Sequence, residues 1–409
     1  MTVIPLGALG RSNSSFAVAS EFEHCFVATD IRNANSRRIF SVQIPFFRYP
    51  HVFGQQRAEI LSRILDVMDR GAFILQKETK EFETRIADFI GVRHAIGTGN
   101  ATDALELSLK AAGIGPGDEV IVPSHTFVAS AASIHNVGAI PVLADCGEDH
   151  LVDPASVEQL VNARTKAIMP VQLNGRVADM DRLQEIATRH RLLIIEDSSQ
   201  GLGARFKGRC AGTFGIAGVF SFYPAKVLGC FGDGGMVVTN DDALAAKIRL
   251  MRDHGRGGHG GGVELWGRNS RLDNFHATVM LVKLDAYPAE ITRRRELAAR
   301  YHAGLKSIPQ LLPPPPPDSS SEHFDIFQNY EVEAENREAL RQHLEAGGVK
   351  TIIQWGGSAI HQFPALGFQC QLPRTELLFR RCFLLPMNTS LTDTEVDYIT
   401  AQIRTFYHC

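Results

Sequence analysis

Apolar positions along this chain first follow a helical period and then alternate between short apolar runs and amphipathic segments. Two early stretches, 55–67 and 77–90, place apolar residues at the spacing of a helix with one buried face. Short apolar runs that predict strands follow at 94–97, 119–123, 139–144, 167–171 and 192–196. Segments of helical period separate these runs, at 102–112, 126–137, 154–161 and 181–190. The alternation predicts an α/β fold with a mainly parallel sheet covered by helices on both faces.

The pattern changes after residue 288. Before it, strands are predicted at 218–222 and 235–239, and helices at 241–254 and 271–284. After it, an arginine-rich helical stretch at 289–305 leads to the proline run 313–317, which predicts an exposed loop. Beyond this loop, the segments 329–332, 337–346, 350–354 and 392–407 predict a smaller α+β unit. We therefore expect an irregular N-terminal extension at 1–43, a large domain at 44–288 and a small C-terminal domain at 289–409.

Composition and charge exclude several classes of partner. The 409 residues carry a net charge of -3, which favours neither nucleic acid nor an acidic membrane surface. The seven cysteines include no CxxC pair, a pattern of reduced thiols rather than of a disulfide framework or a zinc site. No apolar run reaches the ~18 residues of a membrane span, and the N-terminus lacks the basic start of a signal peptide. We expect a cytoplasmic protein with no metal, nucleic-acid or membrane partner.

A lysine in a glycine-rich turn is the first candidate for chemistry. Lys226 lies in the segment 221–235, which begins Ser-Phe-Tyr-Pro-Ala-Lys and ends Gly-Asp-Gly-Gly. Tyr223 and Pro224 interrupt the preceding strand, so Lys226 projects from a loop. By itself, a lysine in a turn is usually a solvated surface group. The residues at other strand ends change that interpretation.

An acid follows a second apolar strand. Asp197 comes directly after the run 192–196, and Gln200, three residues further on, is a neutral hydrogen-bond donor. Taken alone, Asp197 would be interpreted as a helix cap. Sheets of this kind, however, bind ligands at the carboxyl ends of their strands. An ionised Asp197 beside a pyridine nitrogen would favour the protonated ring.

A phosphate site and a ring cover are predicted at two further strand ends. Residues 97–105 form a glycine-containing helix entry, whose free N–H groups and Thr102 hydroxyl suit an anion, and Ser221 offers a second hydroxyl. Phe127, which follows the strand 119–123, can cover a flat ring. Pyridoxal phosphate (PLP) requires a lysine, an acid, a phosphate site and a ring cover. The four segments together predict a PLP site, although none does so alone.

These motifs resemble the PLP-dependent sugar aminotransferases of the DegT/DnrJ/StrS family, within the fold-type I (aspartate aminotransferase-like) group. The resemblance covers about residues 44–409. It includes Asn100-Ala-Thr-Asp-Ala-Leu105, GIGPGDEVIV from Gly113, Glu196-Asp197-x-x-Gln200 and the segment 221–235. It implies a seven-stranded-type, mainly parallel sheet between helices, with PLP bound in the domain 44–288 and a smaller C-terminal α+β domain.

The resemblance also implies a role for each site residue. Lys226 would hold PLP as a Schiff base and then shuttle a proton, while Asp197 would pair with the pyridinium. The other implied cofactor contacts are Ala101 through its backbone, Thr102 and Ser221 at the phosphate, Phe127 on the ring, and Gln200 near the phenolate. Asn269 would reach the phosphate of the neighbouring subunit, which implies a homodimer with shared active sites.

The implied reaction is a transamination in amino-sugar biosynthesis. An amino acid, usually L-glutamate in this family, would give its amino group to a keto group of a nucleotide-linked (deoxy)sugar. The Ser-Phe-Tyr-Pro form at 221–224 resembles members that act on 3-keto sugars, and Lys226 stands where related sugar dehydratases have histidine. Two alternatives stay open: an aminotransferase of a cyclitol or another non-nucleotide ketone, and a non-catalytic regulatory homologue.

Several positions depart from the family pattern. Gln76, Val227, His276 and Gln328 replace the glycine, asparagine, glutamine and histidine that are frequent there. In family members these positions lie near the substrate entrance or the dimer contact, so we expect them to bear on the substrate rather than on PLP. Cations that can meet a nucleotide pyrophosphate, or can equally be ordinary surface charges, are His254, Arg256, Arg268, Arg271 and His361.

Overall fold

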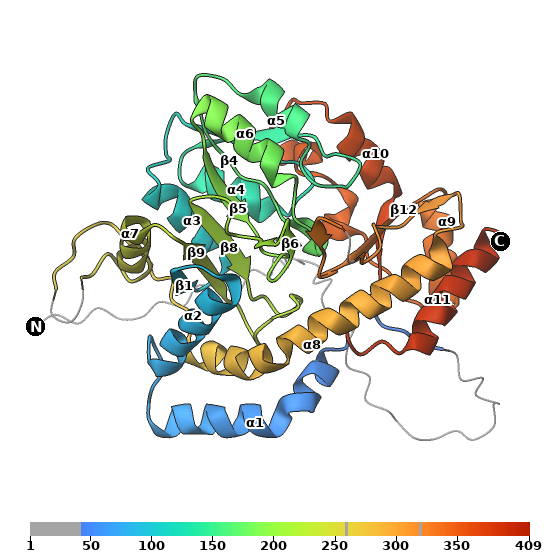
Figure 1. Cartoon of the computed structure of the whole chain (residues 1–409), viewed down its shortest axis with the longest axis horizontal. Helices are drawn as coiled ribbons and strands as arrows, with labels where there is room; N and C mark the ends of the chain where they lie inside the picture. Colours follow the sequence, from blue (N-terminus) through green and yellow to red (C-terminus); the bar gives the residue numbers. More distant parts are fainter. Residues whose placement is uncertain (1–41, 258–260, 319–320) are drawn as a thin grey trace, which may run out of the picture. The chain divides into compact units, whose positions relative to one another are not determined.

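The computed structural model describes residues 42–257, 261–318 and 321–409. The expected extension at 1–43 lies outside these ranges, apart from its last two residues. Within them, a central sheet lies between layers of helices, and a second, smaller sheet packs with the C-terminal helices (Figure 1). None of the helices in the described part of the chain combines the length and apolar character needed to cross a membrane.

The central sheet has seven strands in the order β1-β9-β8-β5-β4-β2-β3. Their bounds are β1 His94–Thr98, β2 Glu119–Pro123, β3 Ile140–Ala144, β4 Thr165–Ile168, β5 Leu193–Asp197, β8 Ala217–Ser221 and β9 Gly235–Thr239. Only β9 is antiparallel to its neighbours, so the other strands point the same way. The prediction of a mainly parallel sheet is confirmed, and the carboxyl ends of β1, β2, β5 and β8 meet at one edge.

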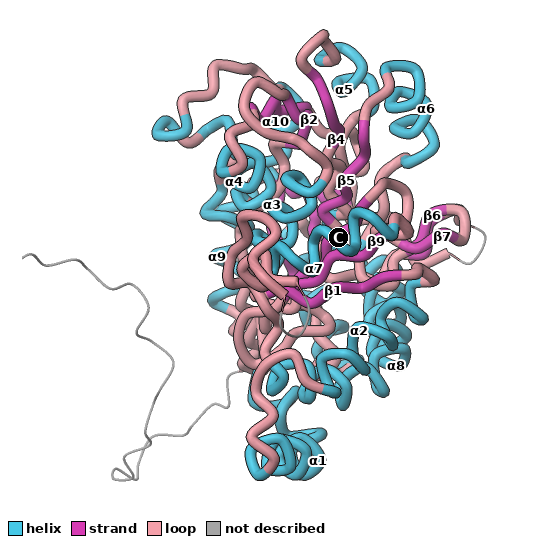
Figure 2. The backbone as a smooth tube through the Cα atoms, turned by 90° about the vertical axis from the view of Figure 1, so that its left-hand side faces the viewer, coloured by secondary structure: helices cyan, strands magenta, loops and turns pink. Residues whose placement is uncertain are grey.

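Helices cover both faces of this sheet because successive strand residues point to opposite sides. Ile194 packs in one core with the helices α2, α5, α6 and α8, whereas its neighbour Ile195 packs in another with α3, α4 and α7. Figure 2 shows α2, α5, α6 and α8 on one side of the strands and α3 and α4 on the other. The helix bounds are α1 Tyr49–Asp69, α2 Lys77–Ile90, α3 Ala101–Ala111, α4 Val128–Asn136, α5 Pro154–Leu160, α6 Met180–His190, α7 Asp242–Arg252 and α8 Asn274–Leu305.

Helix α8 joins two stretches that the sequence pattern separated. It runs through Pro288 without a break, although proline removes one backbone donor and usually ends or kinks a helix. Its first half buries Met280 in a core of the central sheet, and its second half buries Tyr301 in the core of the smaller sheet. Burial on both sides of Pro288 offsets the lost hydrogen bond. The expected domain boundary at 288/289 therefore falls inside one helix, and the division into two domains stays a prediction.

The smaller sheet orders three antiparallel strands as β10-β12-β13. The bounds here are β10 Leu311–Leu312, β12 Tyr330–Ala334 and β13 Cys382–Leu385, with helices α9 Arg337–Ala346, α10 Pro373–Arg381 and α11 Asp393–Phe406. A further small sheet contains β6 Arg205–Phe206, β7 Arg209–Cys210 and β11 His323–Phe324. The segment 350–354 contributes a bridge between Ile352 and Leu384 instead of a strand.

Candidate active site

A cavity of about 510 Å³ opens at the edge where the carboxyl ends of β1, β2, β5 and β8 meet. The predicted site residues that line it are Ala101, Thr102, Phe127, Asp197, Gln200, Ser221 and Lys226. The structure thus brings together all four strand-end segments that the sequence singled out. The carboxyl ends of parallel strands meet at one edge, which is why the predicted residues from Ala101 to Lys226, 125 positions apart, share one cavity.

Gly235 joins two of these segments. In the sheet register it is opposite Thr98 on one side and Ser221 on the other. A side chain at this position would overlap the Asn100 carbonyl, and its Cβ would lie 2.6 Å from the Ala101 nitrogen. The absence of a side chain therefore lets the start of β9 lie directly against the entry of α3.

The entry of α3 is built to receive an anion. The Asn100 side chain caps the helix by accepting a hydrogen bond from the Asp103 N–H at 2.7 Å. The first N–H groups of a helix, here those of Ala101 and Thr102, have no acceptor within the helix. With the Thr102 and Ser221 hydroxyls lining the same cavity, this corner suits a phosphate group.

Lys226 is held in a fixed loop, and its side chain is half-buried in the cavity wall. Its N–H donates to the Tyr223 carbonyl at 2.8 Å. The Gln328 side chain forms hydrogen bonds with both residues that flank Lys226. Its Oε1 accepts from the Val227 N–H at 2.9 Å, and its Nε2 donates to the Ala225 carbonyl at 2.9 Å. Desolvation lowers the pKa of the lysine to about 8, and the nearby Asp197 carboxylate opposes part of that shift.

Asp197 is 5% exposed and faces the same cavity. One carboxylate oxygen accepts from the Ser130 hydroxyl at 2.7 Å, and the other from the Ser199 N–H at 3.1 Å. Because Ser130 donates to Asp197, it must accept at 2.9 Å from Thr126. This relay fixes an acceptor carboxylate close to Lys226, which is the arrangement that a protonated pyridine nitrogen requires.

Two predicted residues have surroundings that the sequence did not foretell. The oxygen of the Gln200 side chain accepts from the Asn174 N–H at 2.8 Å and from the Asn329 amide at 3.4 Å. Phe127, at the start of α4, keeps 54% of its surface exposed although it lines the cavity. Trp355 also lines the cavity, from a turn near the smaller sheet. Trp355 lies outside any periodic segment of the sequence. Only its aromatic side chain could have indicated that it lines a binding site.

Asn269 stands apart from the other predicted site residues. It is exposed, pairs with Asp253 in a short backbone bridge, and does not line the cavity. The candidate pyrophosphate cations are also outside the lining. Arg268 forms ion pairs with Asp103 and Glu106, and Arg271 with Asp253.

Two of the remaining candidate cations have side-chain partners as well. Arg256 pairs with Asp253, and the Nδ1 atom of His361 lies 2.8 Å from the Ser124 hydroxyl. Two departures from the family pattern, Gln328 and Val227, are buried next to Lys226, where Gln328 accepts a hydrogen bond from the Val227 N–H. Their bearing on the substrate stays a prediction.

The fold and the cavity define the class of protein: a PLP-dependent transferase with its ligand site at the carboxyl edge of an α/β sheet. The residues fit the cofactor, because the cavity combines a poorly hydrated lysine, a buried carboxylate and an anion-binding helix entry. Residues 55–404 match the model of the DegT/DnrJ/EryC1/StrS aminotransferase family. The chain belongs to this family and is an aminotransferase.

Named relatives match most of this chain. A dTDP-3-amino-3,4,6-trideoxy-alpha-D-glucose transaminase of Streptomyces venezuelae is 40% identical over 365 residues, 87% of this chain and 94% of the relative. A pleiotropic regulatory protein of Geobacillus stearothermophilus is 37% identical over 374 residues, 90% and 99% of the two chains. Among solved structures, S. venezuelae DesV in complex with a ketimine intermediate is 38% identical, with a TM-score of 0.86 over 90% of this chain and 99% of that one.

Proposed function

We propose that this aminotransferase moves an amino group from L-glutamate to the keto group of a nucleotide-linked deoxysugar, at carbon 3. The observation that carries the proposal is the convergence of Lys226 and Asp197 in one cavity beside an anion-binding helix entry. The S. venezuelae relative supports the sugar class, since it is named for a dTDP-linked 3-amino sugar. The volume of this cavity, about 510 Å³, is within the range of small-molecule binding sites.

Each residue takes one task in this proposal. PLP, when bound, supplies an electron sink. Asp197 keeps the pyridine nitrogen protonated. Lys226, whose pKa is lowered to about 8 by desolvation, removes the substrate proton as a neutral amine and returns it as the ammonium that this step forms. The groups that hold the cofactor are the Ala101 N–H and the Thr102 and Ser221 hydroxyls at the phosphate, Phe127 on the ring face, and Gln200 beside the ring.

We further propose a cytoplasmic homodimer with shared active sites. Asn269 is exposed and does not line the cavity of its own chain, and Trp266, three residues earlier, is 96% exposed. Tryptophan is one of the residue types enriched at protein–protein interfaces. The free thiols of the described cysteines agree with a reducing compartment.

Complementation tests the shared site. Neither Lys226→Ala nor Asn269→Ala alone should be fully active, but mixed dimers contain one site with both residues intact. An equimolar mixture refolded together should regain up to about a quarter of the wild-type rate, because half of the dimers are mixed and each has one intact site. A mixture no more active than its parents would contradict the shared site.

The function is tested by adding substrates in sequence to the PLP-loaded protein. L-Glutamate should change the visible spectrum of the bound cofactor, and a 3-keto nucleotide sugar should restore it with release of an amino sugar. Lys226→Ala should abolish both changes, whereas Lys166→Ala, at an exposed position of β4, should leave them intact.

Other outcomes separate the alternatives. Restoration by a cyclitol ketone but by no nucleotide sugar would replace the proposed substrate class. No spectral response to any amino acid would favour a regulatory role. The G. stearothermophilus relative is named as a regulatory protein.

A further inference from the structure

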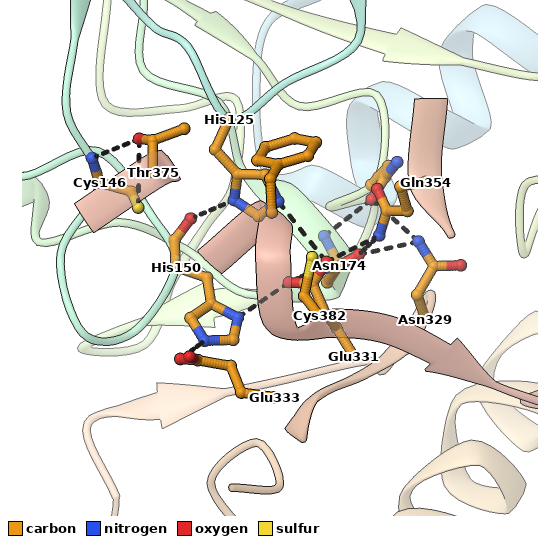
Figure 3. Close-up of polar contacts among 12 residues, drawn as sticks. His125, Cys146, His150, Asn174, Asn329, Glu331, Glu333, Gln354, Thr375 and Cys382 are labelled. Carbon is orange, nitrogen blue, oxygen red and sulfur yellow. Dashed lines mark hydrogen bonds and ion pairs between the residues drawn. The ribbon is translucent and has the colours of Figure 1, made fainter. Parts of the chain in front are cut away.

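A largely buried network of polar side chains connects Asn174 with Glu331 and Glu333 of the smaller sheet (Figure 3). Its charged end lies on β12, where Glu331 is 2% and Glu333 3% exposed. Its other end is Gln200, which lines the cavity. Buried charges are costly unless they are paired, so both carboxylates must have charged or hydrogen-bonding partners.

His150 carries a positive charge at the centre of this network. Its Nδ1 lies 2.8 Å from Glu331 and its Nε2 lies 2.9 Å from Glu333. Each carboxylate can only accept, so both ring nitrogens must donate and the ring is an imidazolium. Burial alone would raise the pKa of Glu331, but the charges and hydrogen bonds of His125 and His150 outweigh it and hold that pKa well below its usual range. Glu331 is therefore an ionised acceptor.

Glu331 in turn orients Asn174. The Asn174 amide nitrogen donates to Glu331 at 3.1 Å, while its oxygen accepts from Asn329 at 2.8 Å and from Gln354 at 2.9 Å. The backbone of Asn174 is left-handed, with φ 55°, a conformation that is uncommon outside glycine and that asparagine adopts more readily than most residues. Three side-chain hydrogen bonds thus hold a turn that the backbone alone does not favour.

The turn at Asn174 determines which end of the Gln200 amide faces a ligand. The Asn174 N–H is only a donor, so the atom that meets it at 2.8 Å must be the Gln200 oxygen. The Asn329 amide nitrogen approaches the same oxygen at 3.4 Å. The Gln200 NH₂ group is then the end available in the cavity, and it can donate to an anionic oxygen of the cofactor.

We propose that Glu331 is a positioning residue of the active site: through Asn174 it fixes the Gln200 amide with its NH₂ group toward the cofactor. The proposal rests on the PLP site described above and deepens the proposed function. Glu331 touches neither cofactor nor substrate, and its side chain reaches the Gln200 amide through the hydrogen bond to Asn174. His150 supports it by keeping the Glu331 carboxylate ionised.

The matched pair Glu331→Gln and Glu333→Gln tests this role. Both variants remove one carboxylate from the same imidazolium, so both should lower the thermal midpoint of the PLP-free protein. Only Glu331→Gln disturbs Asn174. In Glu331→Gln, the visible absorbance of bound PLP should titrate with an apparent pKa raised by roughly 0.5 to 1 unit. A hydrogen-bond donor stabilises the anionic oxygen of the cofactor, so its loss makes that oxygen more basic. Glu333→Gln should titrate as the wild type does.

A second pair of variants ties the effect to Gln200. In a Gln200→Ala background, Glu331→Gln should add no further shift. Asn174→Gly keeps the left-handed backbone but removes the side-chain anchor, and it should reproduce the shift even if Glu331→Gln fails to fold. Equal shifts in Glu331→Gln and Glu333→Gln, or an undiminished shift in the Gln200→Ala background, would overturn the positioning role.

The titration also separates this inference from the proposed function. It needs bound PLP but no amino transfer. A wild-type protein that ignores glutamate, while Glu331→Gln still shifts the titration and Glu333→Gln does not, would reject the proposed reaction and retain the positioning role. Turnover of the keto sugar, with identical titrations in both variants, would support the proposed reaction and reject the positioning role.

Discussion

Lys226 should be an unusually reactive amine in the PLP-free protein. Desolvation in the cavity lowers its pKa from 10.5 to about 8, and the Asp197 carboxylate limits the fall. At pH 7.5 about a quarter of such amines are neutral, against roughly one in a thousand at a pKa of 10.5, a difference of about 200-fold. Removing the charge with Asp197→Asn should lower the pKa of Lys226 further, since only desolvation then acts.

Labelling of amines across the pH range measures this directly. The PLP-free protein is exposed briefly to an amine-specific acylating reagent between pH 6 and 11, and each lysine is quantified by peptide mass. Lys226 should reach half of its maximal rate near pH 8, and near a lower pH in Asp197→Asn. The exposed Lys166 provides the internal reference for reagent decay and pH-dependent hydrolysis.

Two results would refute the reasoning. A half-maximal rate for Lys226 near pH 10 would mean that water reaches the amine and that the cavity does not desolvate it. A rise in the midpoint on Asp197→Asn would mean that the carboxylate does not stabilise the ammonium form, so the two groups would not share one electrostatic environment.

Three further predictions follow from particular contacts. Gly235→Ala should weaken PLP binding roughly tenfold or more by overpacking the α3 entry, whereas Gly54→Ala, with open space around it, should leave the PLP titration unchanged. Burial alone would lower the pKa of His150, but hydrogen bonds to its two carboxylates raise it from 6.5 to about 9. Its stabilisation is complete below pH 6.5 and is lost as the pH rises through 9, so urea unfolding should show about 3 kcal/mol less stability at pH 9.5 than at pH 6.5, a loss that His150→Gln removes. Gln328→Ala should leave the Val227 N–H unpaired and destabilise the protein by about 2 kcal/mol in the same urea assay.

The strand ends could be predicted because the signal for them is local. A run such as 192–196, very apolar and followed by Asp197, indicates a buried strand and a polar edge without knowledge of the rest of the chain. The direction of a strand is not local. The residues of β9 are mostly apolar, and all five are buried. A parallel strand at this place would need the same residues, so the sequence did not distinguish the antiparallel direction of β9 from a parallel one.

The supports of the site could not be predicted for a similar reason. Asn174, Asn329 and Gln354 lie in turns or loops with no periodic pattern, and their side chains meet only through tertiary packing. An amide in a loop usually faces water, so sequence alone favours the wrong interpretation for each of them. The same limit applies to Pro288, which predicts a helix end unless the burial on both of its sides is known.

The short segment 328–331 links the smaller sheet to the chemistry. Gln328 holds the loop of Lys226, Asn329 contacts the oxygen of Gln200, and Glu331 anchors the turn that holds the same oxygen. A departure from the family pattern at Gln328 therefore acts at the lysine, although it lies about 100 residues away in sequence. A shift of this segment by a fraction of a hydrogen-bond length would alter the lysine loop and the Gln200 amide together, so substitutions in the two should not be energetically additive.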